Sequence, residues 1–163
     1  MEEHLIEIYN ENLESIGKKL KKDIDKSKDI FKVAIVFLFN KNSDIFMTEP
    51  QNNLWPGKIG ASSEGPVHHA ESSYDAAQRI IKKDLSIDIK LIPLEEKYYN
   101  LNGIKRILSF FYGKINSQPK INKKEIKNGK WLNQKEIENM IKHNNCIPTF
   151  LIGYDILKNK FGK

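Results

Sequence analysis

The segment EGPVHHAESSYDAAQRIIKKDLSIDI, residues Glu64 to Ile89, decides how this chain is interpreted. Five residues separate Gly65 from Glu71, and seven residues separate Glu71 from Arg79. Residues 65–70 predict a loop, in which the glycine suits a close approach of the backbone to another segment. We expect Glu71 and Arg79 to form an ion pair between this loop and a following helix, which is a structural role.

The second half of the segment predicts an amphipathic helix. Ser72 or Ser73 can cap it, because a side-chain oxygen at that position accepts a hydrogen bond from an otherwise unpaired N–H, and Asp75 lies in its first turn. Apolar residues then recur at intervals of three and four and predict one face buried in a core: Tyr74, Ala77, Ile81 and Leu85. Positions 80, 83 and 84 fall on a neighbouring face.

This spacing is that of the front half of the Nudix box, G-x5-E-x7-R-E-U-x-E-E-x-G-U, in which U is apolar, and the chain therefore resembles the Nudix superfamily. The back half of the box is degenerate. Ile80, Lys83 and Asp84 stand where the family has glutamates, and Ser86 stands where it has a glycine. The resemblance implies an α/β Nudix fold, a mixed β-sheet between helices, formed by residues 1–163 as a single domain.

Nudix proteins usually bind a divalent metal through the box glutamates, and this chain keeps one carboxylate there, Asp84, beside the ammonium of Lys83. At an effective dielectric of about 20, a divalent ion about 5 Å from an ammonium meets repulsion on the order of several kcal/mol. The sequence therefore predicts weak binding of Mg²⁺ or Mn²⁺, or none. Lys82 and Lys83 could instead hold a diphosphate directly; the alternative is a solvated helix face.

Five further segments look like the branch that includes isopentenyl-diphosphate isomerase and its hydrolase relatives. They are IEIYNENLESIG (6–17), LFN (38–40), LWPGK (54–58), INKKEIKNGKW (121–131) and IPTF (147–150). The residues that carry isomerase chemistry do not match, because the isomerase's cysteine before the box glycine corresponds to Glu64, and its arginine pair after the hairpin to Glu49 and Pro50. Isomerase activity is therefore the least favoured interpretation.

Composition places the chain among soluble globular proteins, with 163 residues, 39% hydrophobic, 29% charged, and a net charge of +6. The lysines are spread along the sequence, so we predict no nucleic-acid partner. No segment has the length of a membrane helix and the N-terminus does not resemble a signal peptide, so we expect a cytoplasmic protein without membrane contact. A single cysteine, Cys146, excludes an internal disulfide. Nudix relatives suggest a monomer or homodimer.

The remaining elements follow from apolar patterns and turn residues. The run IFKVAIVFLF at residues 30–39 predicts a strand covered on both faces, and residues 44–48 are expected to pair back on it as a hairpin. Further strands are predicted at 4–9, 90–99, 104–115 and 130–132, and helices at 16–25, 133–143 and 148–161. Residues 49–58 form a loop in which Trp55 either anchors to the core or stacks on a ligand. Residues 116–130 are a polar connection.

Two functions remain open. The first is a binding module for a nucleoside or other diphosphate ligand, with hydrolysis weak or lost, in which four side chains contact the anion: Lys58, His68, Lys82 and Lys83. The second is an active hydrolase that cleaves a nucleoside diphosphate derivative. Asp84 and the carbonyl of Glu64 would then bind metal, and the Glu64 side chain, Glu71 or Glu125 would act as ligand or base. A protein without a ligand is a third, less specific alternative.

Overall fold

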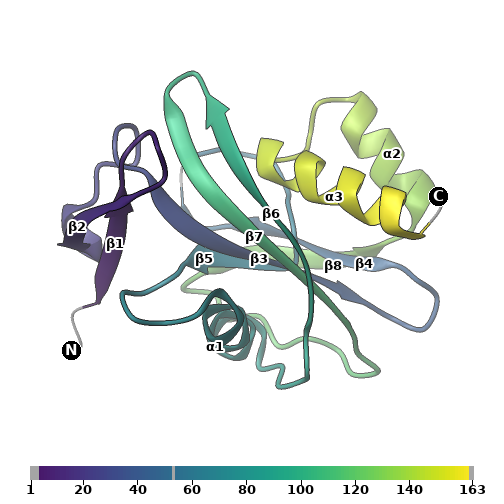
Figure 1. The fold of residues 1–163 in the computed structure, drawn as a ribbon. Helices are drawn as coiled ribbons and strands as arrows, with labels where there is room; N and C mark the ends of the chain where they lie inside the picture. The colour runs from purple at the N-terminus through teal and green to yellow at the C-terminus, as the bar shows by residue number, and fades with distance from the viewer. Residues whose placement is uncertain (1–3, 53, 162–163) are drawn as a thin grey trace.

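The computed structural model describes residues 4–52 and 54–161, and a mixed β-sheet with helices on both faces forms its centre (Figure 1). The strands are β1 (Leu5–Tyr9), β2 (Ser15–Leu20), β3 (Phe31–Phe39), β4 (Ile45–Pro50), β5 (Ser63–Pro66), β6 (Ile92–Leu101), β7 (Ile104–Lys114) and β8 (Ile126–Leu132). The helices are a 3₁₀ turn, η1 (Lys21–Asp23), and α1 (Ser73–Leu85), α2 (Gln134–Lys142) and α3 (Pro148–Phe161).

The central strand β3 is covered on both faces, as its continuous apolar sequence predicts. Alternate residues contribute to two separate clusters, because successive side chains of a strand point to opposite faces. Val33, Ile35 and Phe37 belong to the cluster that includes residues of α2 and α3. Ala34, Val36 and Leu38 belong to the cluster that includes the buried face of α1. In Figure 1, α1 accordingly lies on one side of the sheet, and α2 and α3 lie on the other.

The large sheet has the strand order β6-β7-β3-β4-β8, and β5 pairs with β3 beside this path. β3 and β7 run parallel over their whole length, from Phe31 opposite Arg106 to Phe39 opposite Lys114. The hairpin predicted for residues 44–48 is formed only next to its turn, because β4 pairs with β3 at Phe39 opposite Ile45, and its other partner along its length is β8.

A buried serine holds the sheet together where β3 and β4 separate. The Ser62 hydroxyl donates to the Phe46 carbonyl at 2.6 Å and accepts from the Leu38 N–H at 2.8 Å. Close by, the Thr48 hydroxyl donates to the Ala61 carbonyl at 2.9 Å. These bonds satisfy polar groups that two parting strands would otherwise leave unpaired. Strand β5 lies where β3 and β4 separate, and it brings the loop predicted at residues 65–70, here called the box loop, up to α1.

The helix predicted for the second half of the box segment forms as α1, and the structure adds its cap, its end and the burial of its side chains. Of the two candidate caps, Ser72 is the one used, because its side chain accepts from the Asp75 N–H. Ser86 ends the helix in the left-handed region at φ 57, which is the conformation that the family's closing glycine would adopt. On the neighbouring face predicted for positions 80, 83 and 84, Ile80 and Asp84 are buried and Lys83 is exposed.

The helix predicted for residues 16–25 is wrong. Residues Ser15–Leu20 form β2, which pairs with β1 in a separate two-stranded sheet, and η1 follows. The apolar side chains spaced four residues apart do not form a buried face, since Ile16 is 64% exposed. A tight turn at Asn10 instead reverses the chain, with the Asn10 side chain accepting from two backbone N–H groups.

Two boundaries also differ from the prediction. The start of the expected loop at residues 65–70 belongs to β5, and the polar connection at residues 116–130 ends earlier because β8 begins at Ile126. The two C-terminal helices begin where predicted. Asn133 caps α2 in a reciprocal capping box with Glu136, and Pro148 is the first residue of α3.

Candidate functional site

A cavity of about 400 Å³ lies against β5 and the end of α1. Its walls come from η1 and the segment after it, from β6 and β7, from the connection before β8, and from the start of α3. The charged residues that line it are Lys21, Lys26, Lys83, Lys124, Arg79, Arg106, Glu64, Asp84 and Glu125, and the hydrogen-bonding residues include Tyr99 and Thr149. Its size lies within the range of small-molecule binding sites.

The predicted ion pair of the box is confirmed. Arg79 donates from Nε to Glu71 Oε2 at 2.9 Å and from Nη2 to Glu71 Oε1 at 3.0 Å. Nη2 also donates to the Pro66 carbonyl at 2.9 Å, and Glu71 accepts from the His68 N–H at 3.0 Å. Burial raises the pKa of Glu71, but these hydrogen bonds outweigh it and the pKa lies below its ordinary 4.5. The pair fixes the box loop on α1.

Ile80 stands at a box position where the family has a glutamate, and in this chain its side chain belongs to the core. Its side chain is 2% exposed, and a Cβ on Gly65 would lie 3.2 Å from Ile80 Cδ1. The glycine therefore permits β5 to lie directly against this isoleucine. An ionised glutamate in the same place would lose its hydration without a partner, so the packing here suits an apolar side chain.

Asp84 is the box acid that remains, and it is buried at 5% exposure. The Ser63 hydroxyl donates to Asp84 Oδ2 at 2.6 Å, while no described residue hydrogen-bonds to the buried Oδ1. Burial raises the pKa of this carboxyl, and the hydrogen bond from Ser63 and the charge of Lys83 oppose that effect. Asp84 therefore lines the cavity as a partly satisfied carboxyl group.

Four lysines, here called the lysine cluster, line the cavity: Lys21, Lys26, Lys83 and Lys124. Lys83 pairs with Glu125 at 3.2 Å. Within residues 4–52 and 54–161, the other three have no carboxylate at ion-pair distance. Burial lowers the pKa of Lys21, as do the nearby charges of Lys83, Arg79 and Lys26, whereas Glu125 raises it. The cluster thus holds more positive charge than the protein compensates.

These residues do not fit a divalent cation. No group of three histidine, cysteine, aspartate or glutamate residues arranged for a metal occurs in the part of the chain that the structure describes. Asp84 has a free oxygen, but Lys83 and Lys21 bring positive charge to it, and Glu125 is already paired with Lys83. Hard divalent ions require several oxygen ligands, and the surrounding ammonium groups oppose the ion's charge.

A second set of polar side chains lines the cavity and is here called the Glu64 cluster. It consists of Glu64, Tyr99, Arg106 and Thr149. Burial raises the pKa of Glu64 to about 7, while the charge of Arg106 and a hydrogen bond with Thr149 act in the opposite direction. Arg106 is 6% exposed and Tyr99 is 7% exposed, and the buried Tyr99 hydroxyl has no hydrogen-bond partner among the described residues. Burial also raises the pKa of Tyr99.

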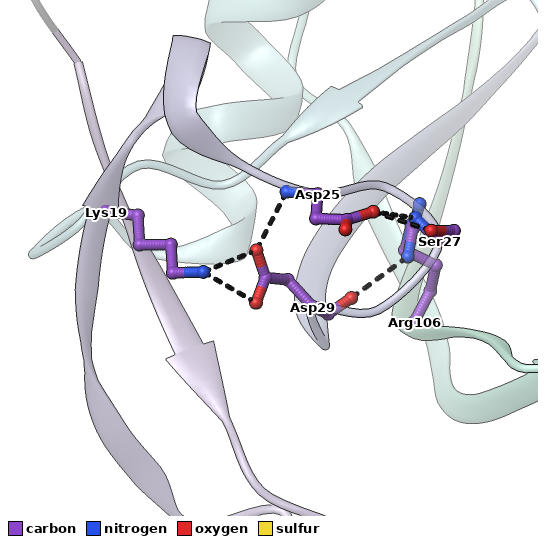
Figure 2. Close-up of polar contacts among 5 residues, drawn as sticks. All are labelled: Lys19, Asp25, Ser27, Asp29 and Arg106. Carbon is purple, nitrogen blue, oxygen red and sulfur yellow. Dashed lines mark hydrogen bonds and ion pairs between the residues drawn. The ribbon is translucent and has the colours of Figure 1, made fainter.

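Arg106 also fixes residues 25–29, the segment that carries Lys26 of the lysine cluster; Figure 2 shows its bond to Asp29. Its guanidinium lies 4.0 Å from the centroid of the Phe31 ring and donates to the Lys26 carbonyl at 2.7 Å and the Asp29 carbonyl at 3.3 Å. Asp29 in turn accepts from Lys19 Nζ at 2.9 Å and from the Asp25 N–H at 2.8 Å. Residues 25–29 are therefore held by β2 on one side and by β7 on the other.

The other residues predicted to contact an anion do not line the cavity. Lys58 Nζ donates to the Asn144 carbonyl at 2.5 Å, and Lys82 is exposed on α1. His68 stacks on His4 with ring centroids 4.1 Å apart, and burial, followed by the charge of Arg79, lowers its pKa to about 4. Trp55, by contrast, does line the cavity and is partly exposed.

Comparisons with solved structures identify the fold of this chain. No family model matches the chain, and no curated protein matches it. Among solved structures, the DR0079 protein from Deinococcus radiodurans has a TM-score of 0.73 at 19% identity, over 87% of this chain and 91% of that one. A Nudix hydrolase from Nitrosomonas europaea has a TM-score of 0.63 at 14% identity, over 82% and 90%.

An Ap4A hydrolase from Caenorhabditis elegans, solved as a binary complex, has a TM-score of 0.61 at 19% identity, over 81% of this chain and 98% of that one. At these identities the likeness concerns the fold. The chain therefore has the Nudix fold, a mixed sheet between helices, as its box spacing indicates. No helix among residues 4–52 and 54–161 is long and apolar enough to cross a membrane.

Proposed function

We propose that this protein binds a small phosphorylated ligand, with a diphosphate group held on the lysine cluster. The observation that carries the proposal is the position of Lys21, Lys26 and Lys124, which line one cavity and have no carboxylate at ion-pair distance among the described residues. Ammonium groups are strong donors to phosphate oxygens. Burial lowers the pKa of Lys21 most, and repulsion from the neighbouring cations adds to it; a bound diphosphate would relieve that repulsion.

The lysine cluster takes the role that a metal ion plays for a diphosphate. Lys83 stands at one of the box positions, and the other three lysines come from η1, the segment after it and the connection before β8. Binding would then not depend on a divalent ion. We expect diphosphates to bind in the presence of a chelator, with affinity that falls as salt is added, because the contacts are ionic.

The test is a panel of inorganic pyrophosphate, ADP-ribose, UDP-glucose, Ap4A and geranyl diphosphate, each measured by thermal shift and calorimetry with EDTA. A ligand at a hundred times its dissociation constant stabilises a protein by about 2.7 kcal/mol, which corresponds to a rise of roughly 5 to 10 °C in melting temperature. If none of the five raises the melting temperature, the proposal is wrong.

A charge reversal locates the site. Lys21→Glu replaces an ammonium group that has no ion-pair partner among the described residues, and a charge-assisted hydrogen bond contributes about 1.5 to 3 kcal/mol, so we expect pyrophosphate to bind at least about 10-fold more weakly. The matched control is Lys135→Glu, which makes the same charge change on the exposed surface of α2, outside the cavity. Equal losses in both variants would point to net charge rather than to this cavity.

The second candidate function is hydrolysis of such a ligand, and the position of Glu64 favours it. A carboxyl group with a pKa of about 7 in the cavity can accept a proton from water near neutral pH, while the lysines neutralise the phosphate charge. The same panel is therefore assayed for product with and without Mg²⁺ or Mn²⁺. Turnover that disappears in Glu64→Gln while pyrophosphate still binds would establish hydrolysis; bound ligands recovered intact under all conditions would leave binding alone.

A further inference from the structure

Lys21 is a lysine of η1 that lines the cavity among charges of its own sign. Within the described residues, no carboxylate lies at ion-pair distance from it. The cations that act on it electrostatically are those of Lys83, Arg79 and Lys26. One carboxylate opposes them, that of Glu125, and it already pairs with Lys83 at 3.2 Å. The surroundings of Lys21 therefore disfavour its protonated form.

These surroundings make Lys21 a candidate nucleophile. Partial burial in the cavity lowers its pKa most, and repulsion from the three cations lowers it further, so more of this lysine is a neutral amine at neutral pH than is usual. Lysines act as nucleophiles when they are desolvated or stand next to another cationic group. The side chain still reaches solvent, so that water and a ligand have access to it.

The other lysines of the cluster define what the ligand of this amine must carry. Lys26, Lys83 and Lys124 line the same cavity, and their ammonium groups are suited to phosphate oxygens. A neutral amine beside them reacts with an electrophilic carbon, and an aldehyde forms an imine with it without any further reactant. The ligand that uses both features carries a phosphate group and an aldehyde on the same molecule.

We propose that Lys21 forms an imine with a phosphorylated aldehyde whose phosphate group is held by the other lysines of the cluster. The amine nitrogen bonds to the carbonyl carbon, and the carbonyl oxygen takes up a proton. The carbon–oxygen bond then breaks as the nitrogen lone pair completes the carbon–nitrogen double bond, and the oxygen leaves as water.

In sum, one ammonium group and one aldehyde give one protonated imine and one water, so the step needs no oxidant, reductant or net proton. The two protons that the ammonium group loses end on that water. The proposal rests on the proposed function in one respect, because it assumes that the lysine cluster binds phosphate. A diphosphate stabilises the ammonium form of Lys21, whereas an aldehyde captures its amine form.

The probe is pyridoxal phosphate, and its match is pyridoxal, which lacks the phosphate. Each is mixed with the protein and reduced with borohydride, and the labelled lysines are located by peptide mass spectrometry. With the aldehyde at about 0.1 mM, a phosphate bound beside the amine raises its local concentration to about 1 mM or more, so we expect about tenfold more label on Lys21 than on Lys135. Lys135 is exposed on α2 and lies outside the cavity. Pyridoxal should show a smaller preference.

Three variants locate the reaction. Lys21→Arg keeps the positive charge but has no amine, so the selective label should disappear. Lys135→Arg makes the same change outside the cavity and should leave the label on Lys21 as it is. Lys124→Met removes a phosphate donor and should lower the label on Lys21 toward that on Lys135. Excess inorganic pyrophosphate should protect Lys21.

The outcomes separate this inference from the proposed function. If pyrophosphate binds but pyridoxal phosphate labels Lys21 no more than Lys135, the imine site is wrong and the proposed function stands. If pyridoxal phosphate labels Lys21 selectively although pyrophosphate does not bind, diphosphate binding is wrong and the imine site stands. A preference for Lys21 that is equally large with pyridoxal overturns the inference, as does selective label on Lys26 or Lys124 in its place.

Discussion

Gly153 allows α3 to lie directly on the central sheet, and Gly153→Ala tests how tight that contact is. A Cβ at this position would lie 2.5 and 2.6 Å from two ring atoms of Phe37 and 2.7 Å from Phe110 Cε1. Carbon atoms at optimal contact are about 3.5 to 4.0 Å apart, so both rings would have to move by roughly an ångström. Each ring is 0 to 1% exposed and has little room to do so.

The two opposing effects of this substitution differ in size. Alanine is favoured over glycine inside a helix by about 1 kcal/mol. An extra methyl group in a packed core is unfavourable by about 1 to 3 kcal/mol, and contact with two buried rings places this site at the upper end. We expect Gly153→Ala to lose about 2 kcal/mol of unfolding free energy, which lowers the melting temperature by roughly 4 to 8 °C for a protein of this size.

Asp155→Ala provides the comparison, because Asp155 is exposed on the same helix and the change tests helix propensity alone. Differential scanning calorimetry would show a small rise in melting temperature for Asp155→Ala and a clear fall for Gly153→Ala. A Gly153→Ala protein that melts at or above the temperature of the unmodified protein would refute the close packing of α3 on Phe37 and Phe110.

Four further predictions concern the box loop, the cysteine and a cap. Arg79→Met should lose about 2 to 3 kcal/mol in urea unfolding, because it leaves the partly buried Glu71 carboxylate without its charged donor; a loss below about 0.5 kcal/mol would contradict the structural role of the pair. Because the pKa of Glu71 is lower in the folded protein than its ordinary 4.5, its contribution is present above pH 4.5 and is lost as the pH falls through the folded-state value, so Glu71→Gln should flatten the acid limb of the stability curve. Burial raises the pKa of the Cys146 thiol to about 11, so Ellman's reagent at pH 8 should modify it at the rate of unfolding and not at the rate of a free thiol. Asn133→Ala removes the capping box of α2 and should lower the unfolding free energy by about 1 kcal/mol. Asn128→Ala on β8, which removes one exposed side-chain hydrogen bond to Glu49, is the comparison.

The sequence predicted those parts of the fold that depend on local chemistry. Ser72, Asn133 and Pro148 mark helix starts because their preferences act within one turn, and the Glu71 and Arg79 pair follows from a fixed spacing across a cap. β2 was mistaken for a helix because Ile16 and Leu20 share a helical spacing by chance. Its true state is set by hydrogen bonds to β1, which lie outside any local window.

The candidate site was predicted less completely, because most of it is assembled from distant segments. Glu64, Lys83 and Asp84 were found through the box and do line the cavity. Lys21 was overlooked because it sits in a lysine-rich stretch where no single residue stands out. Tyr99 and Arg106 come from neighbouring strands, where they are directly paired across β6 and β7, yet only the tertiary packing shows that they share a cavity with Glu64.

The anchoring of residues 25–29 by Arg106 and Asp29 has a kinetic consequence. The segment that carries Lys26 is therefore in place before any ligand arrives, and complex formation needs no preceding rearrangement of it. In stopped-flow mixing we expect one exponential phase whose rate constant rises linearly with ligand concentration and does not reach a plateau.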